Sequence, residues 1–265
     1  MARDDWTTPL KRSAQLAEAA WHGRVLDRWR RISERAASSS LIKLRKRSDR
    51  ARELREALDR TIQVADDRLA LPRIGSTVMR TEPGTDWNWR PELWRILFRE
   101  RGAAQIPRRQ EIGPELTLFH DCDRSEIAVR QIRNSGEDDL APYGLRMEIL
   151  GFDGSFLSIV IELPPEAVEG LGKRHLIRLE AAVETERPLS VYARFNVQHG
   201  PNSDQLTEGL PVERDGAVVE FDLGYSEINE KRVDRAWLDV IFEQPALNQI
   251  VLRDLTLSRY PRAEL

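Results

Sequence analysis

Apolar residues repeat at helical spacing in two stretches near the start of the chain. The first stripe comprises Leu10, Ala14, Ala17, Trp21, Val25, Trp29, Ile32 and Ala36. Its steps of three and four predict a helix over 9–36. A second stripe, heptad-like but interrupted by Ser48 and Arg55, predicts a helix over 41–70. Because only a short serine-rich break separates the two, we expect an antiparallel helical hairpin over 1–71.

Residues 72–114 lose this periodicity. Prolines and glycines are frequent in the segment, and it contains Trp87, Trp89 and Trp94 within eight residues. Aromatic side chains bury large areas, about 150–250 Å² each. We therefore predict a tryptophan- and proline-rich strap that packs on a folded body.

From residue 115 the pattern becomes that of β-strands with turn residues between them. The expected strands are 115–120, 126–133, 144–151, 156–163, 175–184, 189–198, 217–223, 235–243 and 250–259. Several alternate apolar and polar residues strictly, and no helix of crossover length lies between them. This predicts a mainly β protein with a helical N-terminal extension, in which 115–265 form an antiparallel, jelly-roll-like β-sandwich.

The alternation also predicts which side chains the sheets display. If the apolar set faces the core, the outward set on three strands is polar and aromatic. These candidate ligand-binding residues are Tyr192, Arg194, Asn196, Gln198, Trp237, Asp239, Arg178 and Glu180. Aromatic rings stack on sugar rings, while amides, carboxylates and guanidinium groups bond to hydroxyls. One interpretation is therefore a sheet face that recognises a glycan. The alternative is a solvated sheet face with ion pairs between neighbouring strands, on which Trp237 is covered by the strap.

Charge is distributed unevenly along the 265 residues, whose formal net charge is −3. Residues 1–71 hold 17 Lys and Arg against 11 Asp and Glu, whereas 72–265 hold 24 against 33. A basic hairpin with Trp21 and Trp29 is compatible with a protein partner or with peripheral binding to an anionic membrane surface. It is equally compatible with a solvated helix face. The acidic remainder disfavours nucleic acid as a partner.

Composition bounds the compartment. The single cysteine, Cys122, excludes an internal disulfide, and no run of apolar residues is long enough to span a membrane. The first residues contain acids and lack the apolar core of a secretory signal. The default expectation is cytoplasmic residence.

Signatures of enzyme chemistry are weak. His120-Asp121-Cys122-Asp123 could supply metal ligands, but neighbours on a strand point to opposite faces. His199 and Asn202 flank Gly200-Pro201 and read either as loop candidates for binding or as parts of a turn. No phosphate-loop, dinucleotide or nucleophile-elbow motif occurs. We therefore expect no catalytic residues, metal or cofactor, and an enzyme hypothesis rests only on His120, Asp121, Asp123 and His199.

Four stretches carry a resemblance to a known family. They are 84–94 (GTDWNWRPELW), 117–122 (TLFHDC), 196–202 (NVQHGPN) and 248–259 (NQIVLRDLTLSR). Together they resemble an uncharacterised bacterial family of unknown function over most of the chain. The resemblance implies no activity and no site residues.

A looser resemblance concerns the end of the chain. Residues 236–242 (AWLDVIF) followed by 250–257 (IVLRDLTL) are similar to the last two strands of carbohydrate-binding jelly rolls. The resemblance implies glycan binding on a displayed sheet face, by analogy of fold. Two hypotheses follow: a non-enzymatic glycan-binding module, or a scaffolding protein that oligomerises or docks through its helical hairpin.

Overall fold

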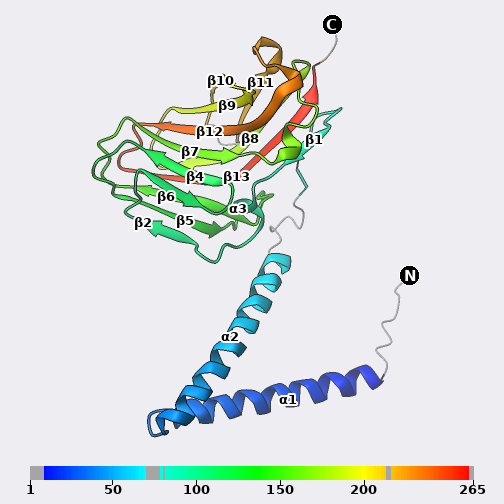
Figure 1. Cartoon of the computed structure of the whole chain (residues 1–265), viewed down its shortest axis with the longest axis vertical. Coiled ribbons are helices and arrows are strands. Elements are labelled where there is room, and N and C mark those ends of the chain that lie inside the picture. Colours follow the sequence, from blue (N-terminus) through cyan, green and yellow to red (C-terminus); the bar gives the residue numbers. More distant parts are fainter. Residues whose placement is uncertain (1–8, 70–77, 80, 213–215, 263–265) are drawn as a thin grey trace. The chain divides into compact units, whose positions relative to one another are not determined.

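The computed structural model describes residues 9–69, 78–79, 81–212 and 216–262, with side chains from residue 20 onward except 63 and 66–69. The chain divides into two compact units, 1–62 and 63–265. In the first, helix α1 (Pro9–Glu34) and the start of helix α2 (Leu41–Leu69) match the two predicted helices within two residues (Figure 1).

Many apolar side chains of the helices are displayed. Leu58 and Ile62, on the predicted seam of α2, are 50% and 56% exposed, and Trp21 on α1 is 62% exposed. Neither helix, over its described residues, is apolar enough to cross a membrane. The antiparallel hairpin stays a prediction, and the helices present apolar surface that the unit itself does not cover.

Within the described residues of the second unit, the strands form two antiparallel sheets. The seven-stranded sheet runs β11-β8-β13-β6-β5-β2, with β1 paired to β13, and the six-stranded sheet runs β10-β9-β12-β7-β4-β3 (Figure 1). The strands of the first sheet are β1 (Trp87–Trp89), β2 (Gly102–Ala104), β5 (Ile127–Arg133), β6 (Tyr143–Ile149), β8 (His175–Thr185), β11 (Ala217–Asp222) and β13 (Asn248–Pro261). Those of the second are β3 (Arg109–Ile112), β4 (Leu116–His120), β7 (Phe156–Glu162), β9 (Val191–His199), β10 (Asn202–Gly209) and β12 (Val233–Glu243).

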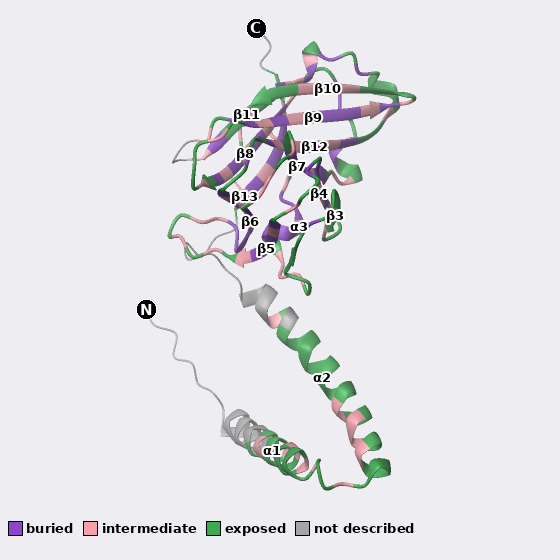
Figure 2. Cartoon of the chain, turned by 90° about the vertical axis from the view of Figure 1, so that its left-hand side faces the viewer, coloured by how far each residue is buried: buried purple, intermediate pink, exposed green. Residues whose placement is uncertain are grey.

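Alternating apolar residues from both sheets meet in one core. Ile159 and Ile161 of β7 and Leu238 of β12 have no exposed area, and the strands show alternate buried and half-buried positions (Figure 2). Phe195 of β9 and Phe221 of β11 stack across the two sheets with centroids 5.7 Å apart. The alternation thus separates an inner apolar face from an outer polar face on each sheet, as predicted.

The described part of 72–114 contributes to both sheets. It supplies β1, the short helix α3 (Glu92–Arg95), β2 and β3. Trp94 is fully buried, and its Nε1 donates to the carbonyl of Leu252 at 3.0 Å. Trp87 and Trp89 stack with centroids 6.3 Å apart and pack against the core from β1, on the sheet opposite to Trp237. Trp87 and Trp89 therefore belong to the seven-stranded sheet, and Trp94 is bonded to that sheet from α3.

The fold class is confirmed: a mainly β protein with two antiparallel sheets and a helical N-terminal region. Short 3₁₀ helices join some strands: η1 (Pro165–Ala167), η2 (Leu223–Tyr225) and η3 (Glu230–Arg232). The proposed division into 1–71, 72–114 and 115–265 remains a prediction.

Candidate functional site

The predicted binding residues fall on two different sheets. Six lie on the adjacent strands β9 and β12 of the six-stranded sheet: Tyr192, Arg194, Asn196, Gln198, Trp237 and Asp239. Arg178 and Glu180 lie on β8 of the other sheet. The expectation of one shared face is corrected here, because alternation along a strand does not show which sheet the strand joins.

Trp237 is the centre of the outer face of the six-stranded sheet. Its partners across the neighbouring strands are Asn196 on β9 and Glu162 on β7. The indole is half-buried, and the guanidinium of Arg235 lies 4.6 Å from its ring centroid. Arg235 also approaches Glu162 at 3.8 Å and pairs in register with Gln198. An aromatic ring and a carboxylate thus share one cross-strand row, and a cation and an amide come from the next row, with the cation over the ring.

Asp239 lies one step along β12 from Trp237, with only 13% of its side chain exposed. Asn196 Nδ2 donates to its carboxylate at 3.2 Å, and Arg194 Nη1 lies 4.0 Å away. Burial raises the pKa of Asp239 above its ordinary value, although the bond from Asn196 and the charge of Arg194 oppose this effect. A carboxylate kept in a site that disfavours its charge is a recognised mark of functional surfaces.

Asn196 is buried rather than displayed, with 1% of its surface exposed. Its Nδ2 donates to Asp239 and to the carbonyls of Arg194 and Trp237. Its Oδ1 is buried without a hydrogen-bond partner among the described residues. Asn196 therefore orients Asp239 from beneath the outer face. Alternation predicted that Asn196 is exposed, and this was wrong because alternation does not show how neighbouring side chains cover an outward position.

Replacing Asp239 by Asn tests whether this carboxylate is held at a cost. The amide oxygen of the new residue can still accept from Asn196, so we expect the free energy of unfolding at pH 7 to stay equal or to rise. Because the folded-state pKa is raised, protonation favours the folded wild type, and the advantage of the variant should shrink as the pH falls through that pKa. Urea unfolding at neutral and acidic pH measures this. A loss of about 2 kcal/mol or more at pH 7 would make the carboxylate a structural partner instead.

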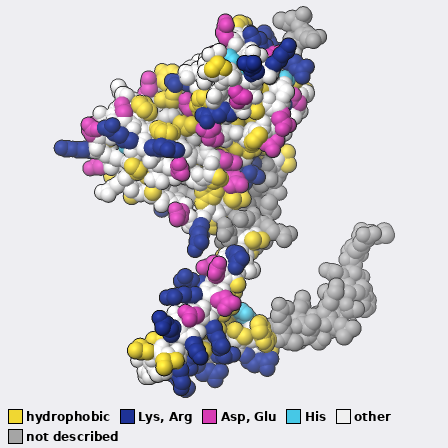
Figure 3. Space-filling model, in the orientation of Figure 1, with side chains coloured by type: hydrophobic (Ala, Val, Ile, Leu, Met, Phe, Trp, Pro, Cys, Tyr) yellow, Lys and Arg dark blue, Asp and Glu magenta, His cyan; other side chains and the backbone are white. Residues whose placement is uncertain are grey.

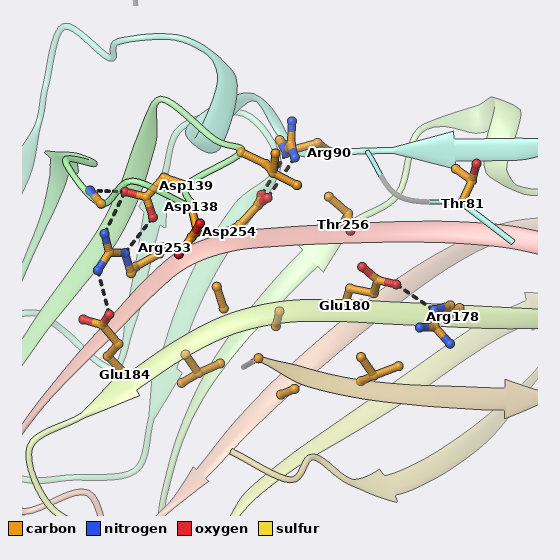
Figure 4. Close-up of a pocket in the computed structure, with 18 of the residues that line it drawn as sticks. Thr81, Arg90, Asp138, Asp139, Arg178, Glu180, Glu184, Arg253, Asp254 and Thr256 are labelled. Carbon is orange, nitrogen blue, oxygen red and sulfur yellow. Dashed lines mark hydrogen bonds and ion pairs between the residues drawn. The ribbon is translucent and has the colours of Figure 1, made fainter. Parts of the chain in front are cut away.

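A groove of about 710 Å³ hollows the outer side of the seven-stranded sheet and includes Arg178 and Glu180 (Figure 4). Neighbouring carboxylates accept hydrogen bonds from arginines that line the groove. Arg178 bonds to Glu180 at 2.7 Å, and Arg253 bonds to Asp139 and Glu184, both at 2.7 Å. No aromatic ring is among the groove residues that the structure describes. The groove has the volume of a ligand site but lacks a platform on which a sugar ring could stack.

The residues of the enzyme hypothesis do not form one site. His120 ends β4 and His199 ends β9, with β12 and β7 between them, and the register places the two histidines at opposite ends of the sheet: His120 is level with Val191, eight residues before His199. At ordinary strand spacing and rise this is a separation of roughly 30 Å. His120 Nε2 contacts the carbonyl of Ile106 at 3.0 Å, and the thiol of Cys122 contacts Asp153 at 2.7 Å. Over the described residues, no group of three or more His, Cys, Asp or Glu could hold a metal ion.

His199 and Asn202 frame a tight hairpin. They face each other in the register of β9 and β10, and Gly200 between them has φ of 60°, a conformation that suits glycine. His199 is buried and Asn202 exposed. The turn interpretation therefore accounts for this stretch, and a binding role for the two residues stays a prediction.

Comparison with known proteins places the chain in a family. The profile of a family of unknown function (DUF6478) matches residues 10–265. The chain belongs to this family. That confirms the resemblance found in the sequence, and no curated protein matches the chain.

Solved structures share the sandwich at low similarity. A family 11 carbohydrate-binding module from Clostridium thermocellum, solved with a mixed-linked tetrasaccharide, matches at 10% identity and a TM-score of 0.36, over 59% of this chain and 95% of its own. A putative sugar-binding protein from Bacteroides thetaiotaomicron matches at 11% and 0.34, over 56% and 89%. Tailspike protein 4 of bacteriophage CBA120, in its enzymatically active domain, matches at 8% and 0.40, over 58% of this chain and 21% of its own. Carbohydrate-binding modules are thus among the structures that the chain resembles, in keeping with the loose resemblance found in the sequence, and likenesses this weak decide nothing about function.

Proposed function

We propose that the chain is a non-enzymatic binding module that recognises a glycan on the outer face of the six-stranded sheet. The observation that carries the proposal is the cluster in which half-buried Trp237 has Glu162 in its own cross-strand row and Arg235 over its ring from the next row, beside the largely buried carboxylate of Asp239. A ring platform beside fixed donors and acceptors is the chemistry that a sugar with several hydroxyls requires.

Each side chain has a distinct part in this proposal. The sugar ring stacks on the indole of Trp237, displacing the guanidinium of Arg235, whose contact with the ring is worth about 0.5–1 kcal/mol at an exposed site. The displaced Arg235 and the nearby Gln198 then donate to hydroxyls, while Glu162 accepts from them. Arg194 and Tyr192 extend the face along β9, one and two register steps beyond the pair of Trp237 and Asn196. Arg178 and Glu180 lie on the other sheet and take no part.

Replacing Trp237 by Ala tests the proposal directly. We expect glycan binding to disappear, while the free energy of unfolding falls by about 1 kcal/mol, because the indole lies outside the core. A glycan array followed by calorimetry on the bound sugar measures binding, and urea unfolding measures stability.

Tyr225 supplies the matched control. It is an 81% exposed aromatic residue with Arg262 over its ring at 5.8 Å, but it lies in η2, outside the proposed face. Tyr225→Ala should bind glycan as the wild type does. Absence of any glycan binding by the folded wild type would contradict the proposal and favour the scaffolding hypothesis. A loss of about 3–5 kcal/mol in the stability of Trp237→Ala would instead mark the indole as part of the core.

The cytoplasmic residence expected from the sequence stays a prediction.

A further inference from the structure

The start of helix α2 displays two apolar side chains among cations. Leu41 is 83% exposed and Ile42 is 77% exposed, higher than the other exposed large apolar residues of the helices. Four basic residues follow them within five positions: Lys43, Arg45, Lys46 and Arg47. Exposing two large apolar groups to water costs free energy, so a surface that covers them would be favoured.

The cations stand where the helix itself does not favour them. The first turn of α2 holds no acidic residue, and the basic cluster lies at the end where the helix dipole is positive. Helix stability would favour Asp or Glu there. A basic cluster at the end of a helix where acidic residues would be more stable indicates an anionic binding partner at this end of α2.

Cations also border an apolar stripe along α2. Leu44, Ala51, Leu58 and Ile62 lie on one face, since their spacings are seven, seven and four. Arg47 borders this stripe, three residues after Leu44, and Arg55 lies within it, four residues after Ala51. The acids Asp49, Glu53 and Glu56 are themselves spaced by four and three, and they lie on the opposite face.

Helix α1 repeats the arrangement. Arg24, Arg28 and Arg35 each follow an apolar residue, Trp21, Val25 and Ile32, by three positions, so a cationic row borders the apolar row. Residues 20–62 hold thirteen Lys and Arg against six Asp and Glu. In Figure 3, dark blue side chains cover much of the helical unit, with yellow apolar groups between them.

From these observations we propose that the helical unit docks on an anionic lipid bilayer. Leu41, Ile42 and Trp21 enter the interface between headgroups and acyl chains, and the flanking arginines and lysines contact the anionic headgroups. Ile42 precedes Asp49 by seven residues and shares its side of α2. Only the first turn of the helix, which holds no acidic residue, therefore enters the interface, and the acids from Asp49 onward stay in water. A second copy of this chain fits the surface less well, because joining two apolar stripes would bring their cationic borders together. This inference does not depend on the proposed glycan site.

The test is co-sedimentation of the full chain with lipid vesicles. One set is pure phosphatidylcholine, and the other contains one-third phosphatidylglycerol. We expect binding to the anionic vesicles alone, and loss of binding near 1 M salt, where the screening length falls to about 3 Å. Replacing both Lys43 and Lys46 by Glu should weaken binding at least about tenfold, since each cation near the surface contributes.

A second variant tests the apolar contribution without altering charge. Replacing both Leu41 and Ile42 by Ser should weaken binding to anionic vesicles by about tenfold, because the insertion of apolar area is lost. The control is Leu150→Ser, which removes a 63% exposed leucine from the sandwich and should bind as the wild type does. Circular dichroism checks that helix content is retained.

Several results would overturn the proposal. They are equal binding to both vesicle types, no binding to either, or salt-sensitive retention on duplex RNA in place of vesicles. A concentration-dependent dimer abolished by the Leu41 and Ile42 replacements, without vesicle binding, would assign the surface to a second copy instead.

Discussion

Replacing Trp94 by Ala is expected to lower the free energy of unfolding of the sandwich by about 3–5 kcal/mol. The side chain has no exposed area and lies in the core, and truncation also removes the bond from Nε1 to the carbonyl of Leu252. Urea unfolding followed by fluorescence measures the change. Trp89→Ala is the matched control, because this indole in the same segment is only half-buried, and its loss should be smaller. Equal losses in the two variants would contradict a core role specific to Trp94.

Removing the carboxylate of Asp254 is the second large expected effect. Arg90, 4% exposed, donates two bonds of 2.8 Å to this carboxylate. Burial raises the pKa of Asp254 even beside Arg90, so desolvation exceeds the attraction within the pair. Asp254→Ala leaves the buried charge of Arg90 without this counter-ion, and we expect a loss of about 3–5 kcal/mol in urea unfolding.

A double variant separates the two sides of this pair. When Arg90→Met accompanies Asp254→Leu, charge and counter-charge disappear together and apolar volume is kept. We expect the double variant to be more stable than Asp254→Ala. If it unfolds as readily as the single variant, packing around Asp254, and not the loss of the carboxylate from the buried charge of Arg90, would explain the decrease in stability.

The strands that the sequence predicted are those with one apolar face. Ile159 and Ile161 on β7, and Ala193 and Phe195 on β9, alternate with polar residues and are buried as expected. The alternation missed the short strands β1, β2 and β3 and the edge strand β10. β10 has the sequence NSDQLTEG and is mostly exposed, so it buries too little apolar area to leave a periodic signal. An edge strand is identified by the strand with which it pairs, and that pairing is set by the tertiary structure, not by the local sequence.

The candidate face was predicted one strand at a time. The outward positions of Tyr192, Arg194, Trp237 and Asp239 follow from alternation, and the structure brings these residues together on β9 and β12. Alternation could not predict the order of the strands, and it is this order that places Arg178 on the other sheet. Nor could it show that Glu162 lies beside Trp237, because that contact depends on the register of β7 against β12.

Strand β13 also constrains when the sandwich can form during synthesis. It pairs with β6 and β8, which precede it, and with β1, which lies far earlier; the ion pair from Arg259 to Asp86 spans 173 positions. Until the ribosome has released β13, β6 and β8 lack the strand that lies between them, and Trp87 and Trp89 have no strand to pair with. We expect the nascent chain to keep apolar strand faces open to chaperones until β13 has left the ribosome, and its refolding to be slow, as for other domains with distant contacts.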